Sequence, residues 1–406
     1  MNPRRVVITG IGTISSLGNN VDEFWSSLSA GRADIKEITR ADTSKMRFTK
    51  GFEISDYKTE DHFDKTSAGL LDRFAQFAAI AAREAIKNSC LASTPGLMEG
   101  AAVITGCGIS GQDSIDLVAR SLYEQKKRGV HPFTVPRVMG NAGASRISME
   151  YGIRGPAYTV TSACASATHA VGQALWMVRH GVVDVAVTGG SEAPFSLGHL
   201  KCWEAMRVMD KESCRPFCKT RKGTILGEGG AILVLESLES AIKRNANIIC
   251  EIVGFGMSSD AHHVTHPTVE GPVRAMQSAI KDAQISPTDV GYINAHGTAT
   301  TINDRNESNA INMVFGEHAK KVYVSSTKSM HGHALGATGA LEVAATAFAL
   351  KTHLLPPTAN VVSQDPECEI NLVTDKALDA DIQYGLSNSF AFGGLNAVLI
   401  LKQFDK

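Results

Sequence analysis

The stretch TVTSACASATHAVG, from Thr159 to Gly172, passes from a run of β-branched residues into an alanine-rich run around a single cysteine. Thr and Val favour a strand, whereas the Ala-rich segment contains no proline and favours a helix. The stretch therefore predicts a strand, a turn at Cys164 and a helix that begins there. The dipole and free N–H groups of a helix N-terminus favour thiolate over thiol. Cys164 is either a nucleophile or a small buried apolar side chain.

Strand-like and helical segments alternate along the whole chain. Short runs of Val, Ile and Ala predict strands at 4–10, 101–106, 157–163, 183–190, 231–237, 248–256, 290–297, 322–326 and 396–404. Longer patterns predict helices at 74–89, 165–181, 271–285 and 340–353. This order predicts an α/β fold whose continuously apolar strands are covered on both faces.

A second strand, serine-containing turn and small-residue helix occurs in the C-terminal part of the chain. VSSTK (324–328), followed by HALGATGALEVAATAFAL, is similar to VTSAC (160–164) and the helix after it. The length of 406 residues suits two domains or one large duplicated α/β unit. The two similar segments favour two similar halves that face each other.

The composition is that of a soluble globular protein and excludes several classes. Hydrophobic residues make up 43% and charged residues 20% of the chain, and the formal net charge is −1. With no basic block, nucleic-acid binding is not expected. The apolar runs are too short for a membrane span, and the N-terminus lacks the features of a signal peptide. A cytoplasmic location is therefore expected.

The eight cysteines are scattered and are expected to be reduced thiols. Cys214 and Cys218, in CRPFC, are the one close pair. A zinc site needs a second pair of Cys or His at comparable spacing, so no metal site is expected.

Two glycine-rich segments have possible roles as loops. GCGISG (106–111) has the spacing of a dinucleotide-binding loop but lacks the following strand with a terminal acidic residue. A tight turn with a close backbone approach is favoured there instead. NSFAFGGLN (388–396) is expected to be a loop before the last strand, where it can offer a backbone N–H to a developing oxyanion.

Histidines and a lysine follow two further predicted strands. NAHGTAT contains His296, and SSTKSMHGHALG contains Lys328, His331 and His333. Residues at strand carboxyl ends in α/β proteins point into the ligand cleft, so these side chains are expected to lie near Cys164. A structural histidine is the alternative at each position.

These motifs together resemble β-ketoacyl-[acyl-carrier-protein] synthases of the elongating, type II kind. The likeness runs nearly end to end through RVVITGIGTISSLG, YGIRGPAYTVTSACAS, LGEGGAILVLE, NAHGTAT, SSTKSMHGHALGATGALE and NSFAFGG. It implies the thiolase-like fold, with two similar halves in a layered α-β-α-β-α arrangement. Residues 1–250 would carry the nucleophilic Cys and residues 251–406 the two catalytic His. It implies an acyltransferase that needs no cofactor or metal of its own.

The implied reaction is the decarboxylative Claisen condensation of malonyl-carrier protein with an acyl-enzyme, which extends the chain by two carbons. Cys164 resembles the nucleophile that takes the acyl chain as a thioester. His296 and His333 resemble the pair that binds the malonyl thioester carbonyl, where two imidazoles can hold an enolate oxygen without a metal. Lys328 resembles the lysine that orders the site, and Glu307 its acidic neighbour.

The resemblance also implies the surroundings of the reacting atoms. The N–H groups of Cys164 and Phe392 would form the oxyanion hole, and Phe392 would gate the site. The other implied residues are Asp304 in support of the site, Thr298 and Thr300 on the pantetheine arm, and Ile109 and Thr134, with Phe392, in the acyl pocket. His262, His263 and His266 belong to a loop that lines the cavity in the family without a metal.

Several positions depart from the family pattern. RPFCKTRKGT has Cys218, Lys222 and Thr224 where Asp, Asp and Phe are usual, and Thr301 stands where proline is frequent. Thr134 stands where a second Phe is usual. These departures keep open a specialised pathway, of the type II polyketide or nodulation kind, in place of housekeeping fatty acid synthesis.

The expected partners are acyl carrier protein and malonyl and acyl thioesters. The chain is expected to form a homodimer, or a heterodimer with a chain-length-factor-like subunit. The acidic carrier would meet a basic patch formed by 126–128, or by Lys201 and Arg207. A non-catalytic acyl-binding scaffold is a further alternative, which the intact Cys164, His296 and His333 disfavour.

Overall fold

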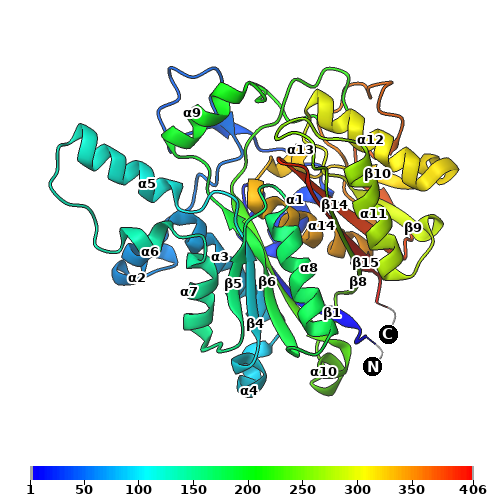
Figure 1. Ribbon diagram of the computed structural model, residues 1–406, viewed down its shortest axis with the longest axis horizontal. Coiled ribbons are helices and arrows are strands. Elements are labelled where there is room, and N and C mark those ends of the chain that lie inside the picture. The colour runs from blue at the N-terminus through cyan, green and yellow to red at the C-terminus, as the bar shows by residue number, and fades with distance from the viewer. Residues whose placement is uncertain (1–2, 405–406) are drawn as a thin grey trace.

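A mixed sheet runs through the molecule, and the structure, a computed structural model, describes residues 3–404 (Figure 1). Within those residues the sheet has eleven strands in the order β12-β10-β9-β14-β15-β8-β1-β7-β6-β4-β5. Its strands are β1 (Val6–Ser15), β4 (Ala102–Gly106), β5 (Ala157–Val160), β6 (Val185–Glu192), β7 (Gly229–Ser237), β8 (Cys250–Ser259), β9 (Val290–Asn294), β10 (Tyr323–Ser325), β12 (Asn371–Leu372), β14 (Tyr384–Ala391) and β15 (Leu395–Lys402). Two small sheets pair β2 (Lys36–Glu37) with β3 (Lys50–Gly51) and β11 (Leu354–Leu355) with β13 (Leu378–Asp379).

The helices cover the sheet and fill the space between its halves. They are α1 (Val21–Ser29), α2 (Lys65–Leu70), α3 (Arg73–Asn88), α4 (Pro95–Glu99), α5 (Gln112–Ala119), α6 (Thr134–Val138), α7 (Ala142–Tyr151), α8 (Ser166–Arg179), α9 (Leu197–Met206), α10 (Leu238–Lys243), α11 (Glu270–Ala283), α12 (Thr301–Phe315), α13 (Lys328–His331) and α14 (Thr338–Thr352). None of the helices within residues 3–404 has the length and apolar character needed to cross a bilayer.

The sheet consists of two halves with the same strand pattern. In the order β5-β4-β6-β7-β1, β4 is parallel to β5 and β6, and β7 is antiparallel to β6 and β1. In the order β10-β9-β14-β15-β8, β9 is parallel to β10 and β14, and β15 is antiparallel to β14 and β8. Among residues 3–404, the strands of the two halves are joined by one short pairing, between β1 and β8. The expectation of two similar halves is confirmed, and the two segments that looked alike in sequence, VTSAC and VSSTK, follow the equivalent strands β5 and β10.

The burial of each helix indicates its layer in the fold. Helix α14 is buried along most of its length, and α8 is buried on most faces, because both lie between the two half-sheets. Helix α3 covers the outer face of β1, β6 and β7, whereas α11 covers the outer face of β8 and β15. This arrangement is the expected α-β-α-β-α layering.

Most predicted strands and helices are present, but β14 was missed. The segment 388–396 was expected to be a loop, whereas residues through Ala391 form a central strand between β9 and β15. The strand carries Ser387, Asn388 and Ser389, which are all buried. Because these polar residues interrupt the apolar pattern, periodicity alone gives no strand there. Only 392–394 form the turn.

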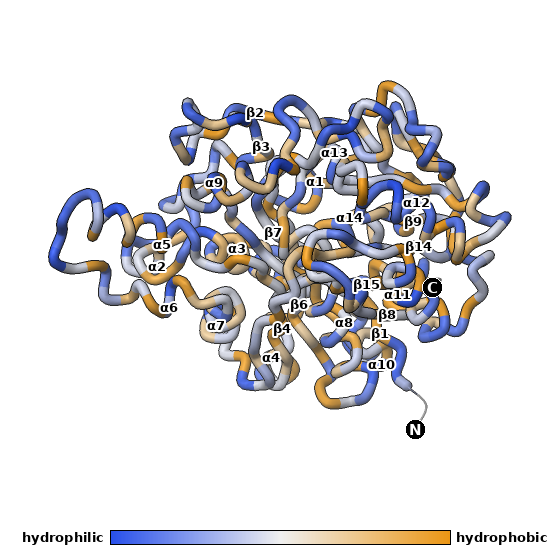
Figure 2. The backbone as a smooth tube through the Cα atoms, turned by 45° about the horizontal axis from the view of Figure 1, so that its top comes forward, coloured by the Kyte–Doolittle hydropathy of each residue, from blue (hydrophilic) through white to orange (hydrophobic). Residues whose placement is uncertain are grey.

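An arm that contains α5 and α6 projects from the body (Figure 1), and its tip is hydrophilic in Figure 2. The large apolar side chains that the arm and its base leave exposed are Ile115, Leu117, Tyr123, Val130, Phe133, Val135 and Met139. Thr134 begins α6 on this arm, and its hydroxyl donates to the His131 carbonyl. The arm therefore offers apolar surface that a single chain does not bury.

The turn after β4 shows why GCGISG is rich in glycine. A Cβ on Gly106 would lie 2.3 Å from the backbone nitrogen of Ala167, at the start of α8. Glycine is thus needed where α8 crosses the strand, and the expected close backbone approach is present.

Gly106→Ala is expected to lower the free energy of unfolding by about 2–3 kcal/mol, because the added methyl group must push α8 away from β4. Gly96→Ala is the matched control, since a Cβ there meets no atom within 4 Å. That change should alter stability by less than about 1 kcal/mol. Urea unfolding measures both, and equal stability of the two variants would contradict the packing argument.

Candidate active site

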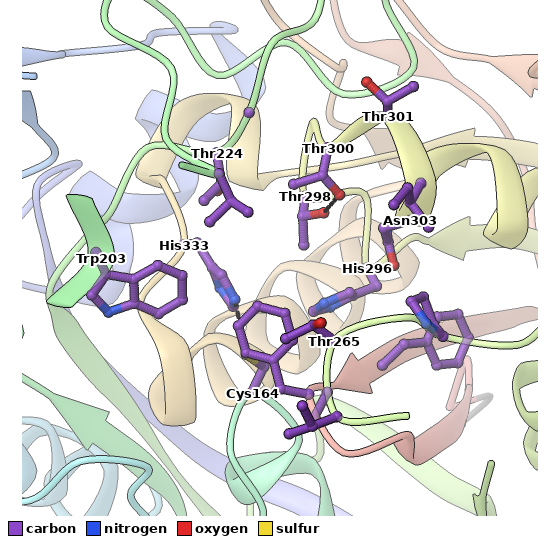
Figure 3. Close-up of a pocket in the computed structure, with 18 of the residues that line it drawn as sticks. Cys164, Trp203, Thr224, Thr265, His296, Thr298, Thr300, Thr301, Asn303 and His333 are labelled. Atoms are coloured by element: carbon purple, nitrogen blue, oxygen red, sulfur yellow. Dashed lines mark hydrogen bonds between the residues drawn. The ribbon is translucent and has the colours of Figure 1, made fainter. Parts of the chain in front are cut away.

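A cavity of about 270 Å³ opens at the carboxyl ends of the parallel strands and reaches Cys164 (Figure 3). Six of the residues predicted for the site line it, namely Cys164, His296, Thr298, Thr300, His333 and Phe392. They come from the turns after β5, β9, β10 and β14. The fold thus collects side chains from both halves of the chain in one chamber.

A sharp turn between β5 and α8 positions Cys164. Ala163 has φ +50°, a left-handed conformation that reverses the chain direction just before the cysteine. The Ser166 hydroxyl accepts from the Ser162 N–H at 2.9 Å and donates to the Ala163 carbonyl at 2.7 Å, which holds this turn. Helix α8 begins at Ser166, two residues after the cysteine.

Cys164 Sγ lies 3.1 Å from His333 Nε2, so the predicted thiol and imidazole are in direct contact. The His333 N–H donates to the Ile225 carbonyl, and the Gly227 N–H donates to the His333 carbonyl. These two hydrogen bonds fix the loop after α13. On the other side of the ring, Nδ1 lies 3.0 Å from the Thr338 hydroxyl. A hydroxyl can donate or accept, so Thr338 suits either tautomer of His333.

His296 is oriented by a buried lysine. Lys328 Nζ lies 3.2 Å from His296 Nδ1 and donates to Glu342 Oε1 at 2.5 Å. Because an ammonium group has donors only, His296 Nδ1 must accept, and the ring proton is on Nε2. The rings of His296 and His333 are 5.6 Å apart at nearly a right angle. Both imidazoles therefore border the same part of the cavity.

The acidic side chain that pairs with Lys328 is Glu342, and Glu307 is a nearby carboxylate on which the lysine charge also acts. Glu307 accepts the backbone N–H groups of His296 at 2.8 Å and Gly297 at 2.7 Å. It therefore holds the loop that carries His296 and does not pair with the lysine. Glu342 was missed, although a single acidic residue on the otherwise apolar α14 is itself a sign of a buried ion pair.

Asp304, predicted to support the site, is fully buried at the start of α12. Its carboxylate accepts the Phe217 N–H at 2.8 Å and lies 3.5 Å from Arg221 Nε. Burial raises the pKa of Asp304 to about 7. The residue thereby ties α12 to the segment that leads to Lys222 and Thr224.

Burial dominates the electrostatics of the reacting groups. It raises the pKa of Cys164 to about 11, although the Lys328 charge and the N–H groups of Phe392 and Cys164 oppose this rise. The N–H group at the helix start does lower the thiol pKa, as expected, but desolvation of the charge outweighs it and the net pKa rises. Burial also lowers the pKa of His296 and of His333 well below the ordinary value, and Lys328 adds to both shifts. The resting site holds a thiol and two neutral imidazoles.

Thr224, Lys222 and Arg207 lie at the mouth of the cavity. Thr224 lines the wall, and Lys222 and Arg207 are exposed at the rim. Neither rim cation has an ion-pair partner among residues 3–404. Lys201, by contrast, pairs with Glu204. The cavity entrance is thus positively charged.

Ile109 and Thr134 do not line this cavity. Ile109 packs on an apolar cluster that includes Phe195 and Trp203, whereas Thr134 lies on the projecting arm. The acyl pocket expected at these two residues stays a prediction, as does the boundary at residue 250.

Two further residues were missed by the sequence analysis. Glu192 is fully buried and accepts the backbone N–H groups of Gly108 and Gly336, which joins the turn after β4 to the segment after His333. Trp203 lines the cavity beside Phe392. Glu192 ends strand β6, so its strand-end position was a signal that could have indicated it, whereas Trp203 lies within α9 and had no such signal.

Among residues 3–404, no group of three or more His, Cys, Asp or Glu side chains is arranged to hold a metal ion. His263 lines the cavity, as expected of its loop, and its Nδ1 lies 3.0 Å from that of His266.

Comparison with known proteins identifies one family of relatives along nearly the whole chain. Residues 3–241 match the family model for the beta-ketoacyl synthase N-terminal domain, and residues 249–362 match that for the C-terminal domain. The chain is 43% identical over 409 residues to 3-oxoacyl-[acyl-carrier-protein] synthase 2 of Staphylococcus aureus (strain COL), covering 99% of each. It is 43% identical over 400 residues to nodulation protein E of Rhizobium sp. (strain N33), covering 98% of this chain and 99% of the relative.

A solved structure described as the ishigamide ketosynthase/chain length factor superposes with a TM-score of 0.95. The two chains are 36% identical, and the match covers 99% of this chain and all of the other. The thiolase-like architecture is thus shared with a ketosynthase.

The raised pKa of Cys164, to about 11, predicts how its alkylation depends on pH. Thiolate is the reactive form, so the rate with iodoacetamide should rise about 100-fold between about pH 7 and pH 9 without a plateau. Peptide mass spectrometry separates Cys164 from the exposed Cys90 and Cys202. A plateau near pH 7 would mean that the sulfur is already ionised by His333, contrary to the electrostatics above.

Proposed function

Because the chain belongs to the β-ketoacyl synthase family, we propose that it condenses malonyl-carrier protein with an acyl group carried on Cys164. The observation that carries this proposal is the 3.1 Å contact between Cys164 Sγ and His333 Nε2, with His296 in the same cavity. The residues from 1 to 250 would supply the nucleophile and those from 251 to 406 the two histidines. Strand β8, which begins at Cys250, supports that division.

In the first step Cys164 attacks the thioester carbonyl of the acyl donor. His333 Nε2 takes the thiol proton as the sulfur–carbon bond forms, which overcomes the raised pKa of the thiol. The negative charge on the carbonyl oxygen is stabilised by the N–H groups of Cys164 and Phe392, both of which face the sulfur. When the intermediate collapses, the pantetheine thiol leaves with the proton from His333, and the acyl chain remains on Cys164.

In the second step the malonyl thioester carbonyl lies between the two imidazoles. His296 donates through Nε2–H, and His333 also donates through Nε2–H once it adopts the tautomer whose Nδ1 accepts from the Thr338 hydroxyl. With both donors on the carbonyl oxygen, carbon dioxide leaves and the remaining electron pair forms an enolate. Each well-placed donor is worth about 3 kcal/mol in comparable oxyanion holes. The enolate carbon attacks the acyl carbonyl, the bond to Cys164 breaks, and the released thiolate takes up one proton from water, which is the proton that decarboxylative condensation consumes overall.

Lys328 acts on this step through His296. Its ammonium group occupies the Nδ1 side of the ring, so Nε2 keeps the proton that the enolate oxygen needs. Glu342 balances the buried charge of the lysine. Lys328 is thus a positioning residue for the donor.

The cavity entrance fits a substrate that arrives on a long prosthetic arm. Thr298 and Thr300, whose hydroxyls lie 2.9 Å apart on the wall, would hydrogen-bond the pantetheine amides. Arg207 and Lys222 would meet the acidic carrier protein at the rim. No cofactor or metal of the enzyme's own enters these steps.

The assembly would be a dimer that covers the apolar surface of the projecting arm. A second copy of the chain, or a chain-length-factor-like subunit, would bury side chains such as Tyr123, Phe133 and Val135. Thr134 would then lie at the subunit boundary, next to the acyl pocket expected there.

We place the enzyme in the cytoplasm.

Thr224 and Lys222 favour a second candidate, condensation in a specialised polyketide or lipid pathway. They replace the usual aromatic and acidic side chains on the cavity wall and rim, which changes both the width and the charge of the entrance. Product analysis with defined acyl-carrier proteins, with and without a partner subunit, should then give polyketide or unusual unsaturated chains. A product set limited to ordinary membrane fatty acids would remove this candidate.

Separate tests of the two half-reactions check the assigned roles. Cys164→Gln should abolish condensation, because no acyl-enzyme forms, yet leave malonyl decarboxylation unchanged or faster. His333→Ala should suppress both reactions, since it removes the base and a carbonyl donor. Release of carbon dioxide and formation of β-ketoacyl product measure the two activities.

Mass spectrometry completes this test. The wild-type protein should carry an acyl adduct on Cys164 during turnover, whereas an acyl-binding scaffold would carry none. Equal loss of both activities in the two variants would contradict the roles given to Cys164 and His333.

A further inference from the structure

The ring of Phe392 rests on the indole of Trp203 at the mouth of the cavity. The ring centroids are 6.0 Å apart and the planes are inclined by 26°, a stacked arrangement. Phe392 is 36% exposed, so only part of its ring is covered, whereas Trp203 is 8% exposed. Both residues line the cavity that leads to Cys164, and Figure 3 shows Trp203 on its wall.

Trp203 is itself held in place by a neighbour on the same helix. Its Nε1–H donates to His199 Nε2 at 2.7 Å, across one turn of α9. Burial lowers the pKa of His199 to about 4, so the ring is neutral and can accept this hydrogen bond. The indole therefore has a fixed orientation before any substrate arrives.

Two further contacts hold helix α9 in place near the Trp203–His199 pair. At its start, the Gly198 N–H donates to Asp116 of α5 at 2.7 Å. On the inner face, Trp203 packs with Phe195, Leu200 and Leu226 in one apolar cluster. The indole is a rigid surface, whereas Phe392 lies in the short turn between β14 and β15.

Two groups of Phe392 lie near Cys164, namely its main-chain N–H and its aromatic ring. Its main-chain N–H faces the sulfur and opposes the rise in the thiol pKa. Its ring lies in the path to the same sulfur. The ring and the N–H belong to one residue of a short turn, so we expect loss of the surface under the ring to shift the backbone of that turn and with it the N–H.

We propose that the Trp203–His199 pair fixes the closed position of Phe392, and so controls both access to Cys164 and the aim of the Phe392 N–H. Trp203 is then a positioning residue for the condensation. This inference rests on the proposed oxyanion role of Phe392. It concerns side chains on α9 that act only through the gate residue.

Removing the indole should have two effects in opposite directions. In Trp203→Ala the ring loses its support, so iodoacetamide should alkylate Cys164 about fivefold faster at a fixed pH, since thiol reactivity follows access. The same loss misaligns the N–H, so kcat for condensation should fall about tenfold, less than the loss for a deleted oxyanion donor. KM for malonyl-carrier protein should change little.

Conservative variants separate positioning from a general structural defect. Trp203→Phe keeps an aromatic surface under Phe392 and should stay within about twofold of wild type in both measurements. His199→Gln keeps an acceptor for the indole N–H, whereas His199→Leu removes it. The Leu variant should show faster alkylation and lower kcat, and the Gln variant should be close to wild type.

Trp25→Ala is the matched control, because Trp25 stacks on Phe348 and does not line the cavity. It should leave the alkylation rate of Cys164 and kcat unchanged. If Trp203→Ala proves too unstable to study, the Trp203→Phe and His199 variants carry the test.

Unchanged alkylation of Cys164 in both Trp203→Ala and His199→Leu would overturn the proposal. It would also be overturned if His199→Gln were as defective as His199→Leu, since then the hydrogen bond would be irrelevant. Alkylation needs no carrier protein or substrate, so it tests this pair even if no acyl-enzyme forms. Absence of an acyl adduct on wild-type Cys164 would instead refute the proposed function.

Discussion

Close packing of α8 against α14 is the constraint on which the geometry of the site depends. Both helices are rich in small residues, and a Cβ on Gly339 of α14 would lie only 2.0 Å from the Thr168 hydroxyl of α8. These helices form the layer between the two half-sheets, so their spacing decides how near the turn after β5 comes to the loop after α13. The contact between Cys164 and His333 follows from that spacing. Larger side chains in this layer would move the sulfur and the imidazole apart.

Burial then decides the charge state of the groups that meet there. The three side chains are buried, so the thiol of Cys164 keeps its proton and the two imidazoles stay neutral. The buried positive charge of Lys328 is balanced by the carboxylate of Glu342. Two consequences follow for the chemistry. The sulfur becomes nucleophilic only as its proton passes to His333, and His296 always offers Nε2–H to an incoming oxygen.

Control of access is separate from this chemistry and uses residues nearer the surface. Phe392 joins the two regions, because its N–H points inwards to the sulfur while its ring meets Trp203 at the mouth. Around it, Thr224 lines the wall of the entrance and Lys222 is exposed at its rim. The reacting groups and the groups at the entrance are thus different side chains, and Phe392 contacts both sets.

The sequence by itself determined the alternation of strands and helices, the two similar halves, and the positions of Cys164, His296, Lys328 and His333. These signals are local, since strand-end motifs and apolar runs can be recognised within a dozen residues. Only the tertiary structure decided that Glu342 balances Lys328, that Glu307 holds the backbone beside His296, and that β14 is a strand. It also decided that the thiol pKa rises and does not fall. Each of these depends on what surrounds a group in space, and burial and partnership are properties of segments that lie far apart along the chain.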